Sequence, residues 1–251
     1  MAETLDVVIA MPAYNEEAAI ESFLTDIAAA FSDTSFHIVV IDDCSTDRTR
    51  DVLESLATRG LPLTTATNQR NSGHGSSTLT ALHLALDLEP HYVVATDGDG
   101  HITGDTLRHL YDEAASATPS SVIEGVRTQR DDPWFRKSVS AATRSLVKHH
   151  SGHSPKDANT PFRAYPVATL RKLLPHISAD HMTPNLMVSV LLRRGNLPFR
   201  EIPITPHKRE GTDENGSTWK QQIRLIPSRR FVQFCLKATG QWLTPTRVEQ
   251  Q

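Results

Sequence analysis

Apolar residues in the first hundred positions follow two alternating patterns. Residues 5–11, 37–41 and 92–96 are short continuous runs rich in β-branched side chains, which predicts buried strands. Residues 18–31 carry apolar side chains three and four positions apart, which predicts a helix. Weaker versions of the two patterns predict a helix over 50–58, a strand over 63–67 and a helix over 77–86. We therefore expect an α/β fold with a mostly parallel central sheet flanked by helices.

The second half of the chain continues the alternation less regularly. It predicts helices over 105–117, 137–149 and 187–194, and strands over 121–126, 161–165 and 197–204. Residues 205–217 are polar, contain two glycines and suggest a mobile lid. The tail from 219 to 243 is helical in composition.

Polar side chains gather where the predicted strands end. Asn15, Glu16, Asp42, Asp43 and Asp97 all follow an apolar run directly. Ligands of parallel sheets bind at the carboxyl ends of the strands. This coincidence is the main physical argument for a binding site.

The sequence DGDGH at 97–101 adds a candidate metal site. Asp97, Asp99 and His101 follow the predicted strand at two-residue intervals, so their side chains can converge at one edge of the sheet. Two carboxylates with a further donor suit Mg²⁺ or Mn²⁺, and substrate phosphates and water can fill the remaining positions. A polar turn after a strand is the alternative explanation for an isolated Asp-x-Asp.

Composition narrows the class of protein. The chain has 251 residues and a net charge of −3, which argues against a nucleic-acid binder that works by bulk electrostatics. No apolar run approaches the roughly 18 residues that cross a bilayer. Cys44 and Cys235 form no metal-ligand pattern. We expect a cytoplasmic protein with free thiols, either in solution or peripheral on the cytoplasmic membrane face.

Four motifs in order give the chain a family resemblance. MPAYNE at 11–16, DDCSTD at 42–47, NSGHG at 71–75 and DGDGH at 97–101 resemble the inverting glycosyltransferases of family 2, which have the GT-A fold. The resemblance covers residues 5–217 and is closest to the dolichol-phosphate mannosyltransferase and polyprenyl-phosphate glycosyltransferase branch. It implies a GT-A catalytic domain over 1–217 and a C-terminal helical tail over 218–251.

The resemblance implies a nucleotide-sugar site and a cation. The donor, GDP- or UDP-linked, would be bound by Pro12, Tyr14, Glu16, Asp42, Asp43, Asn71, Gly73 and Asp97. Mg²⁺ or Mn²⁺ would be held by Asp97, Asp99 and His101 and would neutralise the charge that develops on the leaving diphosphate. Asp47 fits better as a helix cap than as a ligand, and Asn71 and Gly73 can also simply shape a turn.

The second half carries the acceptor side of the resemblance. Arg127, Arg130 and Arg136 stand where the branch has arginines that face phosphate, and an arginine fork suits phosphate oxygens. Residues 157–163 resemble the branch's Asp-x-x-x-Gly-Phe-Arg segment, with Pro161 in place of the glycine. The resemblance implies that Arg209 reaches the phosphates from the lid, together with Arg127 and Arg136, and that Arg130, Arg163 and Ser217 bind the acceptor.

The expected reaction is sugar transfer with inversion to a polyprenyl phosphate. A hydroxyl acceptor needs a general base, whereas an acceptor phosphate is already an anion at neutral pH. The base position is poorly marked, with Asp180 and His181 as its candidates. The same chemistry on a hydroxyl acceptor, a nucleotide-sugar module without catalysis, and a nucleotidyltransferase remain the alternatives.

Two further features have competing explanations. His149, His150 and His153 could hold zinc, but no fourth ligand is marked nearby, so they fit better as the end of a helix. The tail places apolar side chains at helical spacing, with Arg229, Arg230 and Lys237 elsewhere on the helix. The tail therefore packs on the domain or rests on anionic lipid as a peripheral membrane helix.

Overall fold

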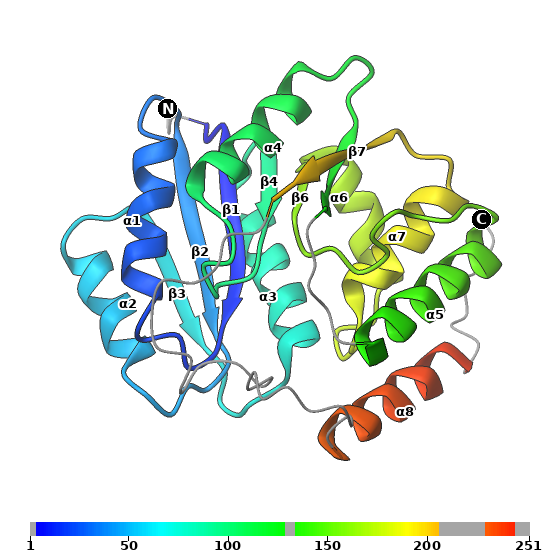
Figure 1. The fold of residues 1–251 in the computed structure, drawn as a ribbon. Helices are drawn as coiled ribbons and strands as arrows, with labels where there is room; N and C mark the ends of the chain where they lie inside the picture. The colour runs from blue at the N-terminus through cyan, green and yellow to red at the C-terminus, as the bar shows by residue number, and fades with distance from the viewer. Residues whose placement is uncertain (1–3, 129–133, 206–228, 244–251) are drawn as a thin grey trace.

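The computed structural model describes residues 4–128, 134–205 and 229–243. Its centre is a seven-stranded sheet in the order β3-β2-β1-β4-β6-β5-β7. Neighbouring strands run parallel, except that β6 is antiparallel to both β4 and β5. The prediction of a mostly parallel sheet flanked by helices is confirmed (Figure 1).

Strands and helices alternate along most of the chain. In order, the elements are β1 (Val7–Ala13), α1 (Ile20–Ala30), β2 (Phe36–Asp42), α2 (Thr49–Thr58), β3 (Leu63–Thr67), α3 (His74–Asp87), β4 (Tyr92–Ala95), α4 (Gly104–Ser116), β5 (Val122–Arg127), α5 (Trp134–Ser151), β6 (Arg163–Pro166), α6 (Val167–Leu173), the 3₁₀ turn η1 (Leu174–His176), α7 (Pro184–Arg194), β7 (Phe199–Ile204) and α8 (Arg229–Leu243).

The helices cover both faces of the sheet because the strands are apolar on both faces. In β1, Val7 and Ile9 belong to a core cluster built with α1, α2 and α4. Val8 and Ala10 point the other way, into a cluster built with α3, α6 and α7. Strands buried on both faces appear in a sequence as continuous apolar runs, which is the pattern seen here in β1.

The antiparallel strand β6 joins two halves of the sheet. One half consists of β3, β2, β1 and β4, and the other of β5 and β7. Ala95 at the end of β4 pairs with Arg163 at the start of β6. On the other side, Glu124 of β5 pairs with the same Arg163. The seam between the halves thus lies beside the segment that carries Asp97.

The structure shifts some predicted boundaries. α3 begins at His74 instead of residue 77, so the histidine of the NSGHG motif lies in the first helical turn. α7 begins at Pro184 instead of residue 187, with the proline in the first turn, where its missing N–H is not needed. α6 and η1 were not predicted, because seven- and three-residue pieces are too short to show a clear period.

The described residues include only part of the segments to which the remaining fold predictions apply. Most of the expected lid, 206–217, and the proposed domain boundary at 217 lie outside the described residues. Both cysteines are free thiols, as expected. None of the helices in the described ranges combines the length and apolar character needed to cross a membrane.

Candidate functional site

The loop after β1 is fixed by the start of α2. Asn15 has a left-handed backbone conformation (φ 54°), and its side-chain oxygen accepts a hydrogen bond from the N–H of Thr46 at 2.8 Å. The N–H of Glu16 donates to the Thr49 hydroxyl at 2.8 Å. This loop, which carries the predicted donor contacts Tyr14 and Glu16, therefore has a defined path. The third predicted contact, Pro12, lies near the end of β1, just before the loop.

Asp43 organises the loop before α3. Its carboxylate accepts hydrogen bonds from the N–H groups of Ser72 at 2.8 Å and Gly73 at 2.9 Å, and from the Asn68 amide at 2.8 Å. The Asn71 amide donates to the Asp43 carbonyl at 3.2 Å. The φ of Gly73 is +88°, which glycine adopts without strain. Asp43, Asn71 and Gly73 thus come together, and their contacts are those of a turn.

Asp42 and Asp47 accept hydrogen bonds in the loops that follow β2 and β1. The buried Asp42 carboxylate accepts hydrogen bonds from the hydroxyl and the N–H of Ser45. Asp47 accepts hydrogen bonds from the N–H groups of Thr49 at 2.9 Å and Glu17 at 3.2 Å. Asp47 therefore supports the start of α2, in line with the predicted capping role.

The two carboxylates of the DGDGH motif follow β4 and pack close to the end of β1. The N–H of Gly98 donates to the Pro12 carbonyl at 3.2 Å, and a Cβ on Gly98 would lie 2.6 Å from that oxygen. Glycine is thus required between Asp97 and Asp99. Both carboxylates are about one-quarter exposed, at 26% and 28%.

Each carboxylate has a histidine beside it. His74 Nε2 lies 3.3 Å from Asp97 Oδ1, and 57% of the His74 side chain is exposed. His101 Nε2 lies 3.4 Å from Asp99 Oδ2, and the backbone N–H of His101 donates to Asp99 Oδ1 at 3.2 Å. His74 was not among the site residues inferred from the sequence. Its position inside the NSGHG motif was the available signal, but only the extension of α3 to residue 74 shows that it meets Asp97.

The pKa values of Asp97 and Asp99 are shifted in opposite directions. Burial and the adjacent Asp97 charge together raise the pKa of Asp99 to about 6. Burial also acts to raise the pKa of Asp97, but His74 and Arg127 outweigh it, so that pKa lies below its usual range. Asp97 in turn raises the pKa of His74 against the effect of desolvation. The ionised form of Asp99 is therefore disfavoured beside the charged Asp97, and a bound cation would stabilise it.

The side chains available as metal ligands fit Mg²⁺ or Mn²⁺ only in part. Across the described ranges, no three His, Cys, Asp or Glu side chains converge to form a complete metal site. Mg²⁺ is commonly held by one or two carboxylates, with the remaining positions taken by water and substrate phosphates. Asp97 and Asp99 suffice for that arrangement. The ligand role of His101 stays a prediction.

Arg127 lies at the same edge, at the end of β5. Its Nε and Nη2 donate to the two oxygens of Asp157 at 2.7 and 3.0 Å, which is a bidentate ion pair. The guanidinium carbon lies 6.0 Å from the centre of the Phe162 ring. Arg127 is among the charges that lower the pKa of Asp97. The structure therefore brings Arg127 toward the carboxylates.

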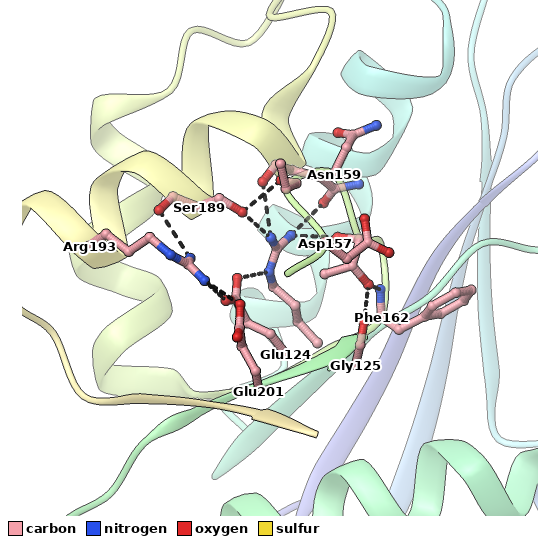
Figure 2. Close-up of polar contacts among 12 residues, drawn as sticks. Glu124, Gly125, Asp157, Asn159, Phe162, Ser189, Arg193 and Glu201 are labelled. Atoms are coloured by element: carbon pink, nitrogen blue, oxygen red, sulfur yellow. Dashed lines mark hydrogen bonds and ion pairs between the residues drawn. The ribbon is translucent and has the colours of Figure 1, made fainter. Parts of the chain in front are cut away.

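Arg163 does not fit the acceptor-binding role that the resemblance implied. Its side chain is 0% exposed and pairs at 2.9 Å with Glu124, which is labelled in Figure 2. No acceptor that arrives from solvent can reach it. The motif Phe162-Arg163 belongs to the interior of the protein, and a lone sequence cannot distinguish a buried arginine from an exposed one.

Most of the other residues predicted to contact phosphate or acceptor lie outside the described part of the chain. Arg130, Arg209 and Ser217 lie in the undescribed ranges, and for Arg136 only its place in α5 is known. Their roles stay predictions.

The candidate base His181 is buried. Its side chain is 3% exposed, and its Nδ1 accepts a hydrogen bond from the N–H of Thr183 at 3.1 Å. Its ring packs edge-on against Trp242 of α8 at 5.7 Å. The same Trp242 donates to the Thr183 hydroxyl at 3.2 Å and stacks near His150 at the end of α5. His181 is therefore a packing residue, and α8 contacts the domain through Trp242.

Comparisons with known proteins identify the family of the chain. Residues 8–175 match the family model described as glycosyl transferase family 2. An undecaprenyl-phosphate 4-deoxy-4-formamido-L-arabinose transferase from Edwardsiella ictaluri is 26% identical over 235 residues, which cover 92% of this chain. The chain spans about two thirds (68%) of that relative's length.

Solved structures resemble the fold. Mannosyl-3-phosphoglycerate synthase from Rubrobacter xylanophilus has a TM-score of 0.64 at 14% identity, covering 94% of this chain and 73% of its own. The mannosyltransferase PcManGT from Pyrobaculum calidifontis, solved with GDP-Man and Mn²⁺, has a TM-score of 0.54 at 21% identity, covering 82% and 57%. The expected GT-A fold is confirmed. With the matched family model, the four motifs at one sheet edge show that the chain belongs to glycosyl transferase family 2.

Proposed function

We propose that this chain transfers a sugar, with inversion, from a nucleotide-diphosphate donor to a polyprenyl phosphate in a metal-dependent reaction. The observation that carries the proposal is the pair Asp97 and Asp99 at the end of β4, where burial and mutual repulsion raise the pKa of Asp99 to about 6. A site with that charge is suited to a divalent cation that also binds a diphosphate. Bound Mg²⁺ or Mn²⁺ would neutralise the charge that develops on the leaving nucleoside diphosphate.

In the proposed reaction, an acceptor phosphate oxygen attacks the anomeric carbon of the donor sugar. The bond from that carbon to the diphosphate breaks, and its electron pair leaves with the nucleoside diphosphate. The chain's own contribution is to hold the two anions together. Arg127 is suited to screen their approach, because a guanidinium binds phosphate oxygens in pairs.

The burial of His181 removes one of the two candidate bases for a hydroxyl acceptor, which supports a phosphate acceptor. This imidazole is 3% exposed and its Nδ1 already accepts a hydrogen bond, so it is poorly placed to collect a proton from an acceptor hydroxyl. The other candidate, Asp180, is exposed. The name of the Edwardsiella ictaluri relative, an undecaprenyl-phosphate transferase, supports the same choice. Because a polyprenyl phosphate resides in a membrane, we also propose that the protein works peripherally at a membrane surface, on its cytoplasmic face.

The first test is donor binding by calorimetry. GDP-mannose, UDP-glucose and UDP-N-acetylglucosamine would be titrated with and without Mn²⁺, and the Asp99→Asn variant would be the control. We expect one donor to bind the wild-type protein only when Mn²⁺ is present. We expect no Mn²⁺-dependent binding of that donor to Asp99→Asn. Metal-independent binding in both proteins would contradict the proposal.

The second test compares acceptors that differ in one group. Undecaprenyl phosphate and undecaprenol share the same lipid and differ only in the phosphate. We expect release of nucleoside diphosphate to accelerate with the phosphate alone. Acceleration by undecaprenol, or by hydroxyl compounds only, would favour the hydroxyl-acceptor alternative.

A further inference from the structure

Three buried charged side chains, Glu124, Arg163 and Arg193, form a network with the partly exposed Glu201. Arg163 of β6 pairs with Glu124 of β5 at 2.9 Å. Arg193 of α7 pairs with the other oxygen of Glu124 at 2.8 Å and with Glu201 of β7 at 2.8 Å. Figure 2 shows Glu124, Arg193 and Glu201 side by side between α7 and the sheet. The network therefore ties β5, β6, β7 and α7 together.

A gain in stability is a weak explanation for this network. The side chains of Glu124, Arg163 and Arg193 are all at most 2% exposed, so each charge has lost nearly all of its water. The desolvation of such pairs often cancels their attraction, and apolar residues of similar volume are frequently as stable. A buried network of charges is better explained by the geometry that it enforces.

The remaining donors of Arg163 fix two segments relative to each other. Nη1 donates to the Thr160 carbonyl at 2.7 Å, in the segment between α5 and β6. Nη2 donates to the Asn185 carbonyl at 3.1 Å and the Ser189 hydroxyl at 2.7 Å, both on α7. The Ser189 hydroxyl then donates to the Ala158 carbonyl at 2.8 Å. One guanidinium thus holds residues 158–160 against α7.

The same segment is also held against β5. The Thr160 hydroxyl donates to the Gly125 carbonyl at 2.5 Å, and the N–H of Gly125 donates to the Phe162 carbonyl at 2.8 Å. A Cβ on Gly125 would lie 3.1 Å from the Phe162 Cβ and 2.9 Å from Ile204, so the close approach depends on glycine. Residues 158–162 are therefore anchored on both sides.

The segment begins with Asp157, the bidentate partner of Arg127. β4 and β5 are both antiparallel to β6 and so run in the same direction, which puts Arg127 at the end of β5 on the edge of the sheet where Asp97 follows β4. The contacts form a continuous path from Arg163 through residues 157–160 to Arg127.

From this path we infer that Arg163 is a positioning residue: it orients Arg127 through the 157–162 segment and does not touch substrate. The inference rests on the proposed function insofar as Arg127 acts on phosphate. Lysine at position 163 would keep the charge opposite Glu124 but lose the planar fork. A single ammonium cannot reach Thr160, Asn185 and Ser189 together. Arg163→Lys is therefore the decisive variant.

The first readout needs no substrate. In ¹⁵N-labelled protein, the Arg127 Nε–H should give a slowly exchanging signal because it donates to Asp157 at 2.7 Å. Disappearance of that signal in Asp157→Asn assigns it. We expect Arg163→Lys to lose the protection of this signal and of the Phe162 N–H, which donates to the Thr160 hydroxyl at 3.3 Å, while the amides of β1 and β2 stay protected.

The second readout is kinetic. We expect kcat/KM for undecaprenyl phosphate to fall about ten- to hundredfold in Arg163→Lys, the scale of a small misplacement of a positioned group. Donor affinity measured by calorimetry should be unchanged. If wild-type protein shows no turnover with this acceptor, the proposed function fails, and the Arg127 signal still decides the positioning role.

Two further variants guard against a merely structural effect. Leu170→Val removes one methylene from a 0% exposed position on α6, in the core cluster on the α3 side of the sheet, and should leave the Arg127 signal intact. Ser189→Ala removes one hydroxyl from the path and decides the question if Arg163→Lys does not fold. An unchanged Arg127 signal in the folded Arg163→Lys or Ser189→Ala protein would overturn the inference. Equal losses of donor and acceptor binding would also overturn it.

Discussion

Asp99 is the single residue at which the proposed function and stability oppose each other. Its pKa of about 6 in the folded protein lies above the ordinary value, so folding disfavours its ionised form. Stability from this group is present at low pH and is lost as pH rises through about 6. We predict that Asp99→Asn raises the unfolding free energy at pH 7.5, without metal, by about 1–3 kcal/mol. Urea unfolding measures this.

The same substitution should abolish Mn²⁺-dependent donor binding in calorimetry. Asp87→Asn, at the exposed far end of α3, is the matched control for a lost charge and should change neither property. A less stable Asp99→Asn protein that still binds donor with Mn²⁺ would contradict the electrostatic account.

His181 gives a pH prediction of the opposite sign. Desolvation lowers its pKa in the folded protein, so the unfolded chain takes up a proton first as pH falls. Stability from neutral His181 is therefore full above the unfolded pKa of about 6.5 and declines below it. His181→Asn should show a shallower loss of stability between pH 7 and pH 5 in urea titrations. An identical slope in both proteins would show that His181 does not contribute.

The sequence predicts residue positions better than residue roles. Asp43, Asn71 and Gly73 meet as their motifs suggested, because neighbouring parallel strands end at one edge. Arg163 was misassigned since burial depends on α7, which is distant in the sequence. The contact of His74 with Asp97 depends on where α3 begins, and boundaries are the least certain part of a periodic pattern.

Among the elements, α3 and the start of α7 are joined by a contact that only glycine permits. A Cβ on Gly75 would lie 2.5 Å from the carbonyl oxygen of His181 and 2.6 Å from that of Met182. These are backbone atoms, so a side chain forces the first turn of α3 outward. His74 lies in that turn and contacts Asp97, so the displacement reaches the carboxylate edge.

We predict that Gly75→Ala destabilises the protein by about 1–3 kcal/mol, as overpacking does, and also weakens donor binding. Gly240→Ala is the control, because its Cβ would meet nothing within 4 Å and alanine favours a helix. Thermal melts and donor calorimetry on both variants make the comparison. Equal melting temperatures for the two variants would show that the contact between α3 and the 181–182 backbone yields easily.

Strands and long helices were predictable, whereas the short helices and the antiparallel direction of β6 were not. β1 and β2 are apolar on both faces, and the continuous apolar run that results is visible in a single sequence. β6 has four residues, and its direction follows from pairing with β4 and β5. Register with distant partners leaves no mark in local periodicity.

At the scale of the whole molecule, the two halves of the sheet share one interior. The cluster that holds Val7 and Ile38 also holds Ile123, Phe162 and Ile204 from the other half. The cluster on the opposite face likewise combines α3 with α6 and α7. A core continuous across the β4–β6 seam predicts one cooperative unfolding transition, because neither half can expose its face alone.

This continuity makes the effect of a bound nucleotide global. The proposed donor loops lie in the half formed by β1, β2 and β4, yet nucleotide with Mn²⁺ should stabilise the other half equally. At a hundredfold excess over Kd the gain is about 2.7 kcal/mol, which for a chain of this size raises the melting temperature by roughly 5–10 °C. Hydrogen exchange of the α7 and β7 amides, and far-UV melts, should therefore shift together when GDP or UDP is added with Mn²⁺. Asp99→Asn should show neither shift. Protection confined to β1, β2 and β4, or two separate melts, would mean that the halves fold independently and that the seam carries no stability between them.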